Sequence, residues 1–229
     1  MQQSGIFGIQ NILDLARLSP YGMDIVEQAI ALVVYPGSRN ENTVERDLST
    51  MVEIIKGLTQ TERFELINVL VEGSKFRNPS SILSDLLVEF FTEISREFDE
   101  IVFIHEATTV PSLKVALSHP NKKIKIVAKS RSLIEKIELW VEFLELKNLK
   151  ISSDSLLLIS RSFETDTTKR LLISVPPFGG RIDEAQLAEN NENVTKFTRS
   201  DEFEVLSILN TGETPAIVVA TDSLLFRGG

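Results

Sequence analysis

Cysteine is absent from this 229-residue sequence, which therefore contains no disulfide, no thiolate metal site and no cysteine nucleophile. Histidine is scarce as well, with only two residues. No apolar run approaches the roughly 18 residues that a membrane-spanning helix needs. The N-terminus also lacks the basic segment of a secretory signal. We therefore expect a cytoplasmic protein with no membrane partner.

Basic residues are outnumbered in this chain. It has 24 lysines and arginines against 33 aspartates and glutamates, which gives a formal net charge of −9. Because DNA repels an acidic surface, we expect DNA binding by the chain alone to be weak. We interpret the densest basic cluster as a solvated strand and helix start rather than a track for phosphates. The cluster comprises Lys122, Lys123, Lys125, Lys129 and Arg131.

The common catalytic signatures are missing too. The sequence shows neither a Ser-His-Asp order nor a glycine-rich phosphate-binding loop of the Walker type. His105 and Glu106 do not open an H-E-x-x-H motif, because Thr109 occupies the place of its second histidine. His119 does not complete a convincing metal site with them. We therefore expect no bound metal.

Residues 1–76 are predicted to form a helical N-terminal region. The first of three expected helical segments is almost continuously apolar after a plausible cap. In the other two, apolar residues recur at a helical spacing. Pro36 and Gly37 follow the first of these segments and are expected to end its helix. The expected helices span residues 24–34, 44–58 and 61–71.

Residues 77–229 are predicted to form an α/β domain. Asn78 and Pro79 are suited to cap a helix and to open its first turn. Short apolar runs then alternate with helical patterns, which indicates a parallel sheet with helices on its faces. The expected strands span residues 101–104, 124–127, 149–151, 171–174 and 216–220, and the expected helices 111–117, 132–146 and 200–209.

Three segments of this second part carry a family resemblance. The run Ser174-Val175-Pro176-Pro177-Phe178-Gly179-Gly180 follows an expected strand, as does Ser153-Asp154-Ser155-Leu156. The third segment, 203–229, ends in Leu224-Leu225-Phe226-Arg227-Gly228-Gly229. In this order the segments resemble the N-6 adenine-specific DNA methyltransferases, particularly the modification subunit of type I restriction-modification systems.

The resemblance implies a Rossmann-like class I S-adenosylmethionine-dependent methyltransferase domain. Its sheet would have the order 3-2-1-4-5-7-6, of which only five strands fit here, so we expect a C-terminally incomplete domain that lacks the last strands. The strand at 216–220 would then be an apolar edge, which favours a fragment of a longer protein or a homodimer. Other restriction-modification subunits and DNA are the further partners that the resemblance implies.

The sequence departs from the family where the cofactor would bind. The resemblance implies a glycine-rich turn after the first strand, but His105, Glu106, Ala107 and Thr108 stand there. Without glycine, this turn resists positive φ and crowds the methionine part of S-adenosylmethionine. After the second strand, Lys129 replaces the carboxylate that holds the ribose, and an ammonium group accepts no hydrogen bond.

The catalytic loop shows the third departure. Val175 occupies the place of the Asn or Asp that accepts hydrogen bonds from the adenine amine in the family. Pro176, Pro177 and Phe178 keep the remainder of the motif. Phe178 either stacks on a flipped base or, as we prefer, plugs an emptied pocket. Asp154 is either an adenine-ring contact or a turn residue.

Together, the three departures predict a methyltransferase-like protein of a DNA-modification or defence system that is catalytically impaired and serves a structural or regulatory role. One alternative is an active adenine-specific methyltransferase that works with a specificity subunit. The other is a module that binds a small molecule or a protein and reuses the fold.

Overall fold

The structure, a computed structural model, describes residues 3–37, 46–73, 85–104, 109–128, 131–153, 168–175 and 214–219. Its chain divides into two compact units. Unit 1 comprises Met1–Pro79 and Glu135–Lys147, and unit 2 comprises Ser80–Ile134 and Asn148–Gly229. The expected domain boundary at residues 76 and 77 lies outside the described residues and stays a prediction.

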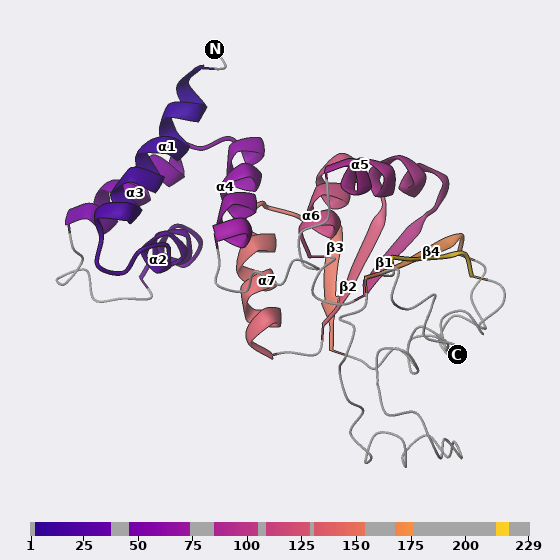
Figure 1. Ribbon diagram of the computed structural model, residues 1–229. Helices are drawn as coiled ribbons and strands as arrows, with labels where there is room; N and C mark the ends of the chain where they lie inside the picture. The colour runs from indigo at the N-terminus through magenta and orange to yellow at the C-terminus, as the bar shows by residue number, and fades with distance from the viewer. Residues whose placement is uncertain are drawn as a thin grey trace, which may run out of the picture. The chain divides into compact units, whose positions relative to one another are not determined.

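Unit 1 is built from helices that bury their apolar stripes against one another. Its core includes Ile30, Met51 and Ile67, none of which is exposed. Each such side chain contributes about 1.5–3 kcal/mol by leaving water. The helices are α1 (Gln3–Leu18), α2 (Asp24–Val34), α3 (Arg46–Lys56), α4 (Gln60–Gly73) and most of α7 (Arg131–Phe143) (Figure 1).

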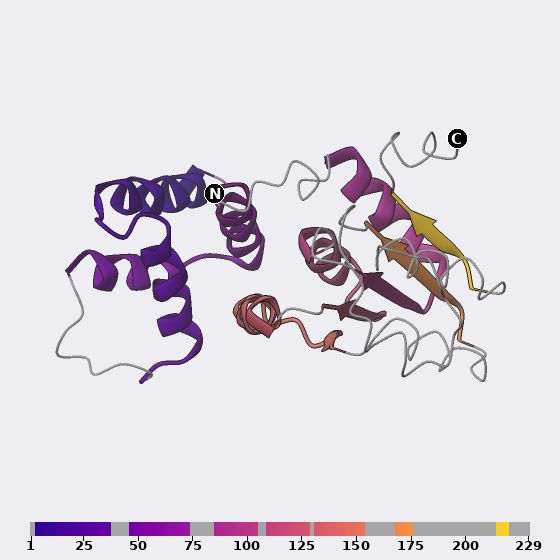
Figure 2. The same ribbon diagram turned by 60° about the horizontal axis from the view of Figure 1, so that its bottom comes forward.

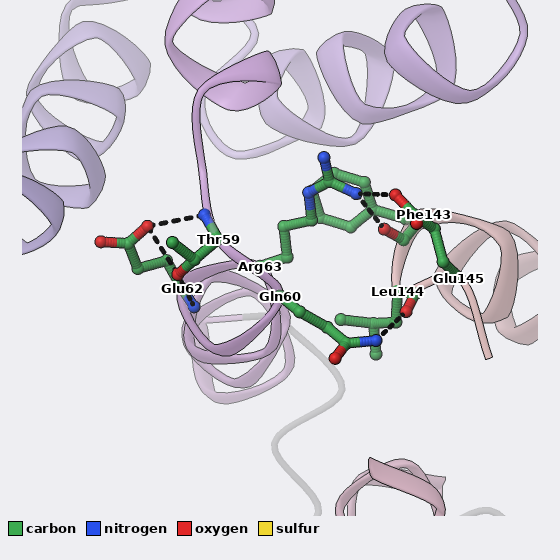
Figure 3. A network of polar contacts seen from close by, with 7 residues as sticks. All are labelled: Thr59, Gln60, Glu62, Arg63, Phe143, Leu144 and Glu145. Atoms are coloured by element: carbon green, nitrogen blue, oxygen red, sulfur yellow. Dashed lines mark hydrogen bonds and ion pairs between the residues drawn. The ribbon is translucent and has the colours of Figure 1, made fainter. Parts of the chain in front are cut away.

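The N-terminus of α4 is closed by a capping box, which is a reciprocal pair of hydrogen bonds between side chains and backbone. The backbone N–H of Glu62 donates to Thr59 Oγ1 over 3.3 Å, and the backbone N–H of Thr59 donates to Glu62 Oε2 over 2.7 Å (Figure 3). The Thr59 hydroxyl also donates to Glu62 Oε2, over 2.8 Å. These bonds explain why α4 begins at Gln60.

The C-terminus of α7 lies three residues before the expected end at Leu146. Glu145 has a φ of 56°, in the left-handed region. Its N–H donates to the carbonyl of Glu142, and the N–H of Leu146 donates to that of Val141, both over 3.0 Å. This is a Schellman motif with glutamate where glycine is usual, so the sequence offered no glycine signal for the helix end.

Side chains of α4 hold this helix end, in an arrangement that we name the α4–α7 clasp (Figure 3). Gln60 Nε2 donates to the carbonyl of Leu144 over 2.6 Å. Arg63 Nη1 donates to the carbonyl of Phe143 over 3.0 Å and to the carboxylate of Glu145 over 2.8 Å. The Arg63 guanidinium also lies 5.2 Å from the centre of the Phe143 ring. The clasp thus satisfies carbonyls that α7 leaves open.

Unit 2 contains a five-stranded parallel sheet in the order β3-β2-β1-β4-β5, as the fold class implied (Figures 1 and 2). All five expected strands are confirmed within a residue or two, although Ala220 lies outside the described residues. The strands are β1 (Glu100–Ile104), β2 (Lys123–Val127), β3 (Leu149–Ser152), β4 (Arg170–Ser174) and β5 (Ala216–Val218).

The helices of unit 2 pack on this sheet. α5 (Asp85–Ile94) runs into the 3₁₀ turn η3 (Ser95–Glu97), and α6 (Thr109–Ser118) connects β1 to β2. Phe91 of α5 meets Phe103 of β1 edge to face, with 6.5 Å between the ring centres. Both rings are fully buried, so this pair anchors α5 to the sheet. The expected helix at 200–209 and the Asn78-Pro79 cap lie outside the described residues.

A buried ion pair joins the first residues of two neighbouring strands. Arg170 Nε donates to Glu100 Oε2 over 2.5 Å, and the two side chains are only 7% and 18% exposed. Glu100 and Arg170 are also paired in the register of β1 with β4. The pair therefore fixes the alignment of the two central strands at their amino ends.

No helix in the described part of the chain is long and apolar enough to cross a membrane.

The capping box predicts a pH dependence. The hydrogen bonds from the Thr59 backbone and then from its hydroxyl lower the pKa of Glu62. A lowered folded-state pKa stabilises the protein above the ordinary glutamate pKa of about 4.3, and this stabilisation is lost as pH falls through the folded value. Glu62→Gln should therefore lower the melting temperature at pH 7, and the difference from wild type should shrink toward pH 3. A difference that stays constant with pH contradicts this role.

The Glu100–Arg170 pair predicts a selective loss of stability in unit 2. Glu100→Ala removes the carboxylate that faces a buried guanidinium and should cost about 3 kcal/mol, read from hydrogen exchange of the Val102 and Phe103 amides. The control is Glu93→Ala, which breaks a 2.8 Å pair with Arg96 whose side chains are more than 60% exposed. It should cost less than about 0.5 kcal/mol. Equal effects of the two variants would refute the assignment.

Candidate functional site

The strand order reverses between β1 and β4, at the centre of the sheet. From β1 the chain builds outward through β2 to β3, and then returns to pair β4 with the other side of β1. In open α/β sheets, ligands bind beside the carboxyl ends of the strands at such a switch point. Here that point lies between Ile104 and Ser174, which are paired in the register. Both are buried.

The carboxyl ends of all five strands form one edge. Ile104 pairs with Val127 of β2, and Val127 pairs with Ser152 of β3. Backbone hydrogen bonds extend this edge beyond the strands, from Ala128 N to the Ser152 carbonyl over 3.0 Å and from Val219 N to the Ser174 carbonyl over 2.9 Å. Backbone pairing between the strands therefore continues for one residue beyond the ends of β2 and β5.

Every expected site segment follows one of these strand ends in the sequence. Of the expected site residues, the structure describes only Val175, directly after β4. The structure thus places side by side the strands after which the expected site segments follow. The roles of the other site residues stay predictions. The site residues outside the described part are His105, Glu106, Ala107, Thr108, Lys129, Asp154, Pro176, Pro177 and Phe178.

Val175 is a buried core residue. Its exposure is 4%, and it continues β4, whose five residues are all buried. An acceptor at this position would have to face a substrate, whereas the valine side chain is enclosed by protein. The residue that follows β4 is therefore part of the hydrophobic core.

Helix α6 begins beside the same edge, at Thr109, five residues after Ile104. The expected helix began at Pro111, but the structure places Pro111 inside the first turn, where proline costs no hydrogen bond. The Ser112 hydroxyl donates to the carbonyl of Thr109 over 2.6 Å, and both side chains are buried. Proline also removes one of the amide donors that a helix N-terminus offers to an anion.

The described residues at this edge do not supply the groups that S-adenosylmethionine needs. Its ribose hydroxyls require an acceptor such as a carboxylate. Neither the carboxyl ends of the strands nor the first turn of α6 carries a carboxylate among the described residues there. We therefore derive no step through this cofactor.

The basic cluster of the sequence is split by the structure. Lys122 Nζ donates to the carbonyls of Arg96 and Phe98, which are the backbone acceptors at the end of η3. Lys123 is exposed, and Lys125 is half-buried opposite Lys150. Lys129 lies outside the described residues, and Arg131 begins α7. Lys122 thus stabilises the end of η3.

Of the two histidines, the structure describes only His119, and His105 lies outside the described residues. His119 Nε2 lies 2.8 Å from the carbonyl of Thr92, a contact that joins the end of α6 to α5. Across the described ranges no group of three or more His, Asp or Glu side chains could hold a metal ion.

No protein-family model and no curated protein matches this chain. Two methyltransferase structures are similar to it. One, from Staphylococcus aureus and assigned as a caffeoyl-CoA O-methyltransferase, shares 12% identity over 49% of this chain and 59% of its own, at a TM-score of 0.36.

The other is coclaurine N-methyltransferase bound to N-methylheliamine and SAH, with 14% identity over 93% of this chain and 60% of its own, at a TM-score of 0.38. The chain thus spans about three-fifths of the length of both structures. A likeness this distant says nothing about the substrate or the chemistry of this chain.

The burial of Val175 predicts the effect of a polar residue at this position. Val175→Asn places an amide among apolar atoms and should lower the free energy of unfolding of unit 2 by about 2 kcal/mol. Urea unfolding followed by circular dichroism measures this loss. The matched control is Val219→Asn, at a half-buried position after β5, which should cost clearly less. A stabilised Val175→Asn would contradict an apolar environment at this position.

Proposed function

We propose that this chain is a degenerate relative of the N-6 adenine DNA methyltransferases, which keeps their fold and has lost methyl transfer. Two features support the proposal. The parallel order β3-β2-β1-β4-β5 is the order that the resemblance implies for the first five strands. The motif-bearing segments also follow the strands that the resemblance assigns to them.

The observation that carries the proposal is the buried Val175 at the carboxyl end of β4. Methyl transfer to an exocyclic amine needs an acceptor that raises electron density on the nitrogen. Valine accepts no hydrogen bond, and an adenine amine held against it would lose its partner at a cost of about 1–3 kcal/mol. The substitution therefore weakens both base binding and the chemical step.

The segments expected to bind S-adenosylmethionine support the same proposal. By the resemblance, S-adenosylmethionine would lie against residues 105–108 after β1, against Lys129 after β2 and beside Asp154 after β3. The first segment has no glycine, and Lys129 cannot accept from the ribose. Since these losses concern separate strand ends, one neighbouring residue could not compensate for all of them.

We propose a structural or regulatory role in a DNA-modification or defence system. The partners would be other restriction-modification subunits, and DNA would be held by the assembly rather than by this acidic chain. The outer edge of β5 offers a further place for pairing, either with another subunit or with a second copy. In the described residues β5 is paired only with β4.

Calorimetric titration with S-adenosylmethionine tests the proposal. The expected result is no saturable heat up to millimolar cofactor, and no tritium transferred from labelled S-adenosylmethionine to adenine-containing duplex DNA. Val175→Asn alone should not restore transfer, because the ribose and methionine contacts are missing too. Micromolar cofactor binding together with methyl incorporation would instead establish an active enzyme, for example one completed by a specificity subunit.

A further inference from the structure

Three lysines lie on one face of the sheet in unit 2, on the neighbouring strands β2 and β3. Lys123 and Lys125 are two residues apart in β2, so their side chains leave the sheet on the same face. Lys150 of β3 is paired with Lys125 in the register and therefore lies on that face as well. Lys123 and Lys150 are exposed, and Lys125 is half-buried. We name these three residues the β2–β3 lysine patch.

The patch is confined to the amino half of this face. The carboxyl half carries a buried apolar cluster instead, which begins in β2 two residues after Lys125. The lysines therefore lie away from the carboxyl edge of the sheet, after which the expected cofactor and catalytic segments follow. The apolar cluster comprises Val102, Ile104, Val127 and Leu172, with Ala216 packed against it.

No carboxylate among the described residues neutralises the patch. Glu100 is paired with Lys123 in the register of β1 with β2, but its carboxylate accepts a hydrogen bond from Arg170 Nε. In the part of the chain that the structure describes, none of the three ammonium groups has an ion-pair or hydrogen-bond partner. Like charges directly opposite each other, as at Lys125 and Lys150, destabilise a sheet. A bound anion would remove this repulsion.

We propose that the β2–β3 lysine patch binds phosphate groups of the backbone of duplex DNA. Neighbouring strands lie about 4.8 Å apart, and residues two apart in a strand about 6.6 Å, so the three ammonium groups can reach neighbouring phosphates. Lysine binds phosphate as a point charge. It is depleted in protein–protein interfaces, where arginine and aromatic residues are enriched. The patch contains only lysine, so its composition favours phosphate over an acidic protein surface.

The contact is weak and independent of base sequence. The net charge of −9 repels a polyanion everywhere outside such a patch. Lysines alone offer no ring on which a base stacks, and contacts to phosphates carry no sequence information. Each neutralised phosphate contributes about −0.9 to the slope of log K against log salt, so three lysines give a slope of about −2.7.

This inference goes beyond the proposed function. The phosphate chemistry follows from the lysines, and only the choice of DNA rests on the proposed role in a DNA-modification system. An active enzyme and a degenerate one would present the same patch. The experiment contains no S-adenosylmethionine, so its failure would remove the patch as a DNA contact and leave the loss of methyl transfer to the calorimetric test.

Fluorescence anisotropy of a short labelled DNA duplex, titrated with the full chain, tests the proposal. Between about 50 and 200 mM salt, binding to wild type should weaken about fortyfold, as three phosphate contacts predict. Lys125→Gln should bind more weakly at the lowest salt and lose only about twelvefold over this range, because two contacts remain. Lys125→Arg keeps the charge and should behave as wild type does. Duplexes of unrelated sequence should bind equally well.

The matched control is Lys169→Gln, which changes the net charge by the same amount in the same unit. The Lys169 ammonium lies 4.0 Å from Glu97 Oε2 and 5.4 Å from the centre of the Phe98 ring. It is thus already engaged at η3, and its loss should leave the salt dependence of wild type. Equal effects of Lys169→Gln and Lys125→Gln would overturn the proposal, because net charge alone would then explain them.

A measurement without DNA checks the charge environment of the patch. Lys125→Gln should raise the melting temperature at low salt, and the gain should disappear near 1 M salt, where the screening length is only about 3 Å. A lower melting temperature at low salt would show that Lys125 stabilises the sheet by itself and would overturn the patch.

Two further outcomes decide against DNA. No binding of the duplex at about 50 mM salt, where phosphate contacts are strong, would overturn the proposal. Tighter binding of a polyglutamate peptide that carries the same number of charges would overturn it as well, and would assign the patch to an acidic protein partner.

Discussion

The pairing of β1 with both β2 and β4 is the constraint on which the rest of unit 2 depends. Parallel pairing on both sides directs all five carboxyl ends to one edge and places the reversal of strand order between Ile104 and Ser174. A strand paired on both sides and covered on both faces must be apolar throughout, and only its first residue, Glu100, is not fully buried. The Glu100–Arg170 pair and the Phe91–Phe103 contact both act on this strand.

The same constraint determines the environment of Val175. Val175 continues β4 into the buried part of the edge, where a valine packs at least as well as an amide would. The sheet needs backbone hydrogen bonds and apolar volume there, and valine supplies both.

Unit 1 has a different organising contact. The N-terminus of α4 and the C-terminus of α7 meet, so the open carbonyls of one helix are satisfied by side chains from the first turn of the other. The left-handed backbone conformation costs more free energy for a glutamate than for a glycine. Here the Glu145 carboxylate also forms a 2.8 Å ion pair with Arg63. The helix that links β2 to β3 thereby becomes part of the helical unit.

The sequence by itself determined the strands and most helices, because buried parallel strands require continuous apolar runs and helices require periodic ones. It also indicated the strand order, through the motif resemblance around Val175. The tertiary structure alone decided that Val175 is buried, that Lys122 caps η3 and that α7 ends at Phe143 and packs in unit 1. These features depend on partners distant in the sequence, such as Gln60 and Leu144, which are 84 residues apart. Local sequence patterns do not predict such contacts, because these contacts contribute free energy only once the distant segments have come together in the folded chain.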